Sequence, residues 1–173
     1  RTDFLRQWQL FLNRLEPGDD AAVFFAGHGV EIDGQNFLLP RDVPRVASGE
    51  EEVLKGSGLS LAALLDQVRA RHPQVGLYIL DACRDNPLAR NLARSMGTRS
   101  ASIGSGLAQV QTGVGTFIAY STQPGNVAAD GQGRNSPFTA ALSKRVREPG
   151  RNLTSVMIDV RKDVLAVTGG KQV

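Results

Sequence analysis

The chain has 173 residues, of which 41% are hydrophobic and 21% charged, a balance typical of one soluble globular domain with a sizeable core. Its net charge is +3, and the basic residues are scattered without a long Lys/Arg run or interleaved aromatic residues, so we expect no nucleic-acid partner. No apolar segment is long enough to predict a transmembrane helix, so we expect no membrane partner either. The single cysteine excludes an internal disulfide framework and assigns neither a cytoplasmic nor a periplasmic location.

The first 40 residues predict a helix, a strand and a hairpin. Residues 3–15 carry apolar side chains at helical spacing, so they predict an amphipathic helix. Residues 21–26 are an apolar run without alternation, which indicates a buried parallel strand that ends just before His28. Residues 30–40 are typical of a hairpin, because the Asp-Gly pair at residues 33–34 favours a type I′ turn.

The middle of the chain contains the only cysteine. Residues 41–57 are acidic and aperiodic, so we expect a surface loop there, and residues 60–72 predict a second amphipathic helix. Residues 76–83 form an apolar run that ends at Cys83 and predict a second buried strand. Residues 84–106 are small, polar and Arg-containing, which indicates a long functional or mobile loop.

The last third of the chain continues the alternation of strand and helix. Residues 116–121 predict a third buried strand, and residues 125–135 predict a flexible loop. Ser136 is an N-cap signal and Pro137 a first-turn signal for a helix over residues 137–147, and Asn152 is an N-cap signal for a last helix that ends at Gly169-Gly170. This alternation predicts an α/β layered fold with a mainly parallel sheet.

His28 and Cys83 each follow an apolar strand, and the carboxyl ends of neighbouring parallel strands are where catalytic groups gather in such sheets. An isolated cysteine is usually a buried structural residue, but a histidine at a second strand end favours a nucleophile. An imidazole can take the thiol proton and return it to a leaving amine, while the backbone N–H groups of Gly29 and Cys83 can hold an oxyanion. Two distant histidines and one cysteine do not make a metal site, and we expect no cofactor.

Several motifs together resemble the caspase-like cysteine peptidases, in particular the bacterial members close to metacaspases and paracaspases. These motifs are Phe-Phe-Ala-Gly-His-Gly at 24–29, Gln-Asn-Phe-Leu-Leu-Pro at 35–40, Leu-Asp-Ala-Cys-Arg-Asp-Asn-Pro at 80–87, Tyr-Ser-Thr-Gln-Pro-Gly at 120–125 and Ser-Pro-Phe-Thr-Ala-Ala-Leu at 136–142. The resemblance implies a caspase-like three-layer α/β/α sandwich and a cysteine endopeptidase with a His28/Cys83 dyad.

The resemblance also implies a substrate class. Asp81, two residues before the cysteine, matches the acidic residue that metacaspases and paracaspases place in the pocket for the residue before the cut bond. We therefore expect protein or peptide substrates with Arg, or less favourably Lys, at that position, because a guanidinium binds a carboxylate through two parallel hydrogen bonds. Asp130 lies in the loop where the family places a further pocket residue. The alternatives are a structural acid for Asp81 and an ordinary turn residue for Asp130.

Family members begin with a strand and a helix before the equivalent of residue 1 and continue beyond residue 173. We therefore expect residues 1–173 to form a single peptidase domain, truncated at both ends and lacking its N-terminal strand or strands. The Arg-rich loop predicts self-cleavage after Arg94 or Arg99, unless those arginines only keep the loop solvated. Two alternatives stay open for the function: a relative of the legumain and gingipain peptidases, and a pseudo-peptidase that serves as an interaction or regulatory module.

Overall fold

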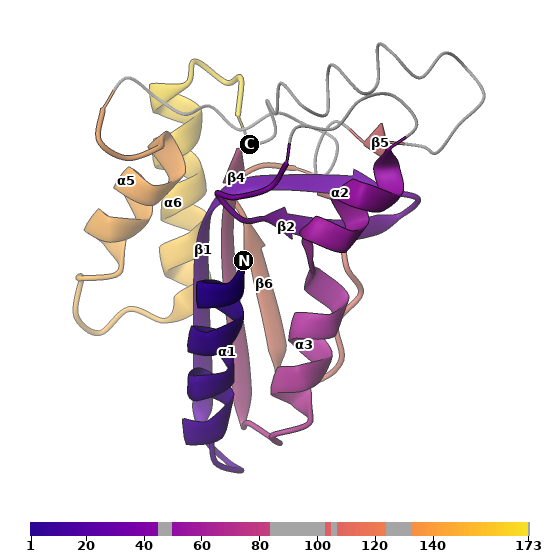
Figure 1. The fold of residues 1–173 in the computed structure, drawn as a ribbon. Helices are drawn as coiled ribbons and strands as arrows, with labels where there is room; N and C mark the ends of the chain where they lie inside the picture. The colour runs from indigo at the N-terminus through magenta and orange to yellow at the C-terminus, as the bar shows by residue number, and fades with distance from the viewer. Residues whose placement is uncertain (45–49, 84–102, 105–106, 124–132, 173) are drawn as a thin grey trace.

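A computed structural model describes residues 1–44, 50–83, 103–104, 107–123 and 133–172 (Figure 1). The strands are β1 (Asp20–Ile32), β2 (Gln35–Leu39), β3 (Leu59–Ser60), β4 (Val75–Cys83), β5 (Ile103–Gly104) and β6 (Thr116–Tyr120). The sheet has the strand order β3-β2-β1-β4-β6, with β5 paired to β1. Strands β1, β4 and β6 are parallel to one another, whereas β2, β3 and β5 are antiparallel to their neighbours.

Helices cover both faces of this sheet and make a three-layer α/β/α sandwich, as the sequence predicts (Figure 1). One face carries α1 (Thr2–Arg14) and α3 (Leu61–Arg69), and the other carries α5 (Pro137–Arg145) and α6 (Leu153–Val167). The short helix α2 (Glu51–Ser57) packs against the β1–β2 hairpin through Leu54, which is fully buried.

The largest core lies between the sheet and helices α1 and α3. The apolar stripes of the two helices supply it, together with alternate side chains of β1 and β4, because successive strand residues point to opposite faces. Its buried members include Trp8, Leu12, Ala21, Leu61, Leu64, Leu65, Val68, Tyr78, Leu80, Ala82 and Leu107.

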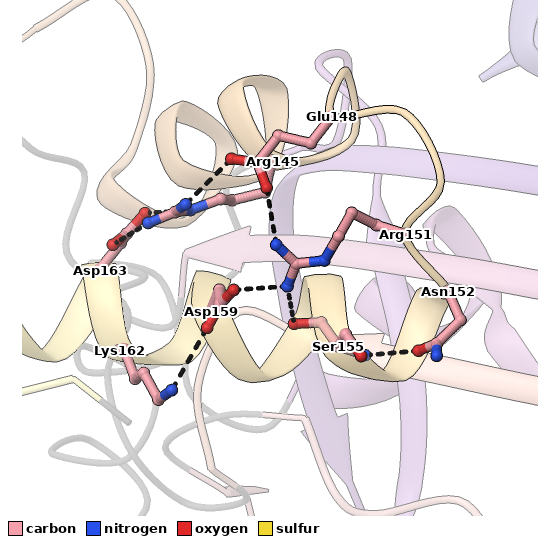
Figure 2. Close-up of polar contacts among 8 residues, drawn as sticks. All are labelled: Arg145, Glu148, Arg151, Asn152, Ser155, Asp159, Lys162 and Asp163. Carbon is pink, nitrogen blue, oxygen red and sulfur yellow. Dashed lines mark hydrogen bonds and ion pairs between the residues drawn. The ribbon is translucent and has the colours of Figure 1, made fainter.

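The opposite face has a smaller core under α5 and α6, which cover β4 and β6 rather than β1. The β1 part of this face is consequently open, and Phe24 is 52% exposed. Ion pairs fasten the two helices to each other, because Arg145 of α5 donates to both oxygens of Asp163 on α6 at 2.8 Å. Glu148 joins the guanidinium groups of Arg145 and Arg151 (Figure 2).

Three local predictions differ from the structure. Residues 41–57 are not a loop throughout, because Glu51–Ser57 forms a helix. The acidic side chains of its first turn interact favourably with the positive end of the helix dipole. Only one leucine of this helix is buried, so the sequence shows no apolar periodicity that would predict it. The strand predicted to end at residue 26 continues to Ile32, because its glycines, including Gly29, extend the pairing rather than break it. The long loop predicted for residues 84–106 contains the short strand β5. The turn at residues 33–34 is confirmed, with φ of 52° and 77°.

Candidate active site

His28 lies where β1 changes its neighbours. Residues 20–28 of β1 pair with β4, and residues 28–32 pair with β2 on the other side, so His28 is the one position with a partner in both strands. Such a change of neighbour leaves the end of one strand uncovered, which is where open α/β sheets place their sites. The His28 side chain is exposed.

Cys83 is the last residue of β4, and its Cα is the register partner of His28. The structure therefore brings the backbone positions of the predicted dyad side by side on adjacent strands. The sequence predicts that the strand ends just before His28, but β1 continues to Ile32. His28 stands instead at the end of the part of β1 that pairs with β4. The other histidine, His72, lies before the amino end of β4 and is far along the strand from this site.

Gly29 is buried, and the space where a side chain would stand is occupied. A Cβ at this position would lie 2.9 Å from Leu107 Cδ2 and 3.3 Å from Ala82 Cβ. Leu107 follows β5 in the chain and is 1% exposed. The residue after His28 thus packs against Leu107, and the residue before Cys83 belongs to the same buried cluster as this leucine, on the α1/α3 face of the sheet.

Asp81 is 4% exposed and holds the start of α5. Its Oδ2 accepts hydrogen bonds from the hydroxyl groups of Ser136 and Thr139, and Ser136 also caps α5 by accepting from the Thr139 backbone N–H at 3.0 Å. The positive end of the α5 dipole stabilises a carboxylate at this position. Its Oδ1 is buried without a hydrogen-bond partner among the described residues.

Asp81 and His28 belong to the same edge of the site. Ala26, the register partner of Asp81, lies two residues before His28, so the two side chains project from the same face of the sheet. The sequence predicts Ser136 only as a helix cap and gives no role to Thr139. Ser136 and Thr139 are three positions apart, a spacing that lets both hydroxyls donate to one acceptor at the start of a helix. Nothing in the neighbouring sequence indicates that this acceptor is Asp81.

The remaining predicted residues lie elsewhere. Asp130, Arg94 and Arg99 are outside the described residues. Within the described part of the chain, no group of three or more His, Cys, Asp or Glu residues is placed to hold a metal ion. No helix in that same part is long and apolar enough to cross a membrane.

The comparison with known families agrees with this architecture. Residues 1–173 match the caspase domain. No curated protein matches the sequence. The α/β sandwich described above is the fold expected of a caspase domain, and the match indicates a function of the cysteine peptidase type. Because the match covers the whole sequence, the chain belongs to the caspase-domain family.

Proposed function

We propose that this protein is a cysteine endopeptidase that hydrolyses peptide bonds after Arg or Lys. His28 and Cys83 form its catalytic dyad, the backbone N–H groups of Gly29 and Cys83 form its oxyanion hole, and Asp81 binds the cationic side chain before the cut bond. The observation that carries the proposal is the register pairing of His28 with Cys83 at the point where β1 leaves β4 and takes up β2.

The proposed reaction follows from the chemistry of these groups. His28 takes the Cys83 proton, and the thiolate attacks the carbonyl carbon to give a tetrahedral intermediate. Backbone N–H groups stabilise its oxyanion, a contribution whose loss typically lowers kcat about 10²- to 10³-fold. The intermediate collapses as the protonated imidazole of His28 gives its proton to the leaving amine. Water then hydrolyses the acyl-enzyme with His28 as general base, and the thiol is regenerated.

The hydrogen bonding of Asp81 supports the cationic specificity. Two hydroxyls occupy one carboxylate oxygen, and the other is left without a partner among the described residues. A buried carboxylate oxygen without a donor is costly, and a substrate guanidinium or ammonium group would supply that donor. The structural role and the binding role therefore use different oxygens of the same side chain.

The test combines peptide cleavage with the reactivity of the only thiol. We expect cleavage of Arg and Lys fluorogenic peptides and little of the Asp peptide, with turnover abolished in Cys83→Ala and in His28→Ala. Because the chain has one cysteine, the mass gained from iodoacetamide reports Cys83 alone. The pH midpoint of its alkylation should lie below the ordinary thiol value of about 8.5 in the wild type and move toward that value in His28→Ala.

Two outcomes would contradict the proposal. Undiminished turnover in Cys83→Ala would assign another nucleophile. A folded wild type without turnover on any of the three peptides, and with an ordinary thiol, would favour the pseudo-peptidase alternative. Circular dichroism of each variant supplies the control that loss of activity is not loss of fold.

A further inference from the structure

We infer that Asn36 is a positioning residue for this reaction: its side chain clamps the chain after β5 so that Leu107 supports the backbone beside both His28 and Cys83. Asn36 lies on β2, where its register partner is Glu31. The inference rests on the proposed function for its kinetic readout, whereas the clamp itself is a feature of the structure.

The clamp is a pair of hydrogen bonds between one side chain and one backbone. Asn36 Nδ2 donates to the Ala108 carbonyl at 2.7 Å, and the Ala108 N–H donates to Asn36 Oδ1 at 2.7 Å. The carboxamide thus pairs with Ala108 as a neighbouring strand would, across 72 positions of sequence. Asn36 is 6% exposed, so water does not compete freely for these groups.

The residue next to the clamp is the one that supports the site. Leu107 precedes Ala108 and packs against Gly29, because a Cβ on Gly29 would lie 2.9 Å from Leu107 Cδ2. Leu107 and Ala82 belong to the same buried cluster, and the same Cβ would lie 3.3 Å from Ala82 Cβ. Gly29 follows His28, and Ala82 precedes Cys83. A shift of Leu107 would therefore loosen both backbone segments that carry the proposed dyad and the oxyanion donors.

A second contact locates the same segment. Gly104 and Ile103 of β5 pair with Glu31 and Ile32, which continue β1 beyond the end of β4. Glu31 is in turn the register partner of Asn36 on β2. The pairing of β5 with β1 thus holds the chain before Leu107, and the hydrogen bonds to Asn36 hold it at Ala108, directly after Leu107. Of these two contacts, only the hydrogen bonds of the clamp depend on a single side chain, that of Asn36.

Two substitutions test the clamp. Asn36→Leu removes both hydrogen bonds and keeps the branching of the side chain, although its two methyl groups are bulkier. Asn36→Asp keeps the acceptor for the Ala108 N–H but puts a carboxylate oxygen in place of the NH₂ donor. Since a misplacement of about 1 Å can cost on the order of 10²-fold in rate, we expect kcat to fall about 10- to 100-fold in both variants. KM should change less than about 3-fold, because the oxyanion donors act on the transition state rather than on substrate binding.

Asn152→Ala is the matched control. Its side chain also accepts a backbone hydrogen bond, from Ser155 N–H at 2.8 Å, but it caps α6 away from the site. This variant should melt earlier and keep the wild-type kcat at temperatures below unfolding. Asn36 variants that lose stability while retaining kcat would behave like this control and overturn the inference.

If neither Asn36 variant folds, Leu107→Met carries the test, because it leaves the hydrogen bonds of Asn36 intact and changes the side chain that packs against Gly29. A lowered kcat supports the inference, and an unchanged kcat removes the route by which Asn36 acts. If the wild type cleaves no peptide, the proposed function fails, and the clamp is judged by alkylation of Cys83. A pH midpoint that shifts in the Asn36 variants but not in Asn152→Ala supports it, and identical midpoints refute it.

Discussion

Asp81→Asn separates the two tasks assigned to Asp81. The amide oxygen of Asn can still accept from Ser136 and Thr139, while its NH₂ group takes the place of the oxygen that lacks a partner. The shape of the side chain and the attachment of α5 are thus retained. The negative charge that would pair with a substrate guanidinium is lost.

The expected magnitude follows from the burial of the site. Truncating one partner of a buried, hydrogen-bonded charge pair costs about 2 to 5 kcal/mol, which at about 1.4 kcal/mol per decade lowers kcat/KM for Arg peptides roughly 30-fold to several thousand-fold. Two hydrogen bonds to a charged acceptor become neutral ones, at a cost of about 1 kcal/mol each. A chain of this length should then melt about 4 to 8 °C lower.

The assay compares Arg, Lys and neutral peptides in the wild type, Asp81→Asn and Thr139→Val. Thr139→Val removes one donor to Asp81 but keeps the charge and most of the volume, so it should lower the melting temperature and leave the ratio of Arg to neutral cleavage unchanged. Alkylation of Cys83 should change little in either variant. Equal losses on all three peptides in Asp81→Asn would refute the pocket assignment and leave Asp81 as a structural acid.

Two further predictions concern ionisable groups away from the site. Arg145 holds the pKa of Asp163 below its ordinary value of 3.8, mainly by hydrogen bonding, so the pair contributes stability above pH 3.8 that is lost as pH falls through the lowered pKa. Arg145→Met should therefore destabilise the protein in urea unfolding at pH 7, with a smaller difference from wild type at pH 3; an equal difference at both would contradict the ion pair (Figure 2). Burial raises the pKa of Tyr78 to about 12. The buried neutral phenol therefore contributes its full share to the stability of the fold below pH 10, and this contribution is lost as the pH rises toward 12. Absorbance titration near 295 nm should show a late phase that Tyr78→Phe removes, and a late phase that persists in this variant would count against it.

The sequence alone determined the features that depend on neighbours a few positions apart. The Asp-Gly turn at residues 33–34 follows from the backbone preference of those two residues, and the Ser136 and Asn152 caps follow from a side chain three positions before the N–H that it accepts. The apolar runs that precede His28 and end at Cys83 predicted two neighbouring parallel strands, which placed both residues at one edge of a sheet. The alternation of strands and helices predicted an α/β layered fold, whereas the three-layer sandwich and the caspase-domain family were implied by the resemblance of the sequence motifs to the caspase-like peptidases.

Only the tertiary structure decided which distant groups meet. The hydroxyl of Ser136 reaches Asp81 across 55 positions, and Asn36 reaches Ala108 across 72, contacts that no periodicity in the chain records. The extension of β1 through Gly29 was likewise decided by the strands that pair with it, because pairing satisfies backbone groups that a lone glycine-rich segment would leave to water. Local patterns thus predicted most of the helices and strands, whereas the end of β1 and the partners of buried polar groups depend on how those elements pack together.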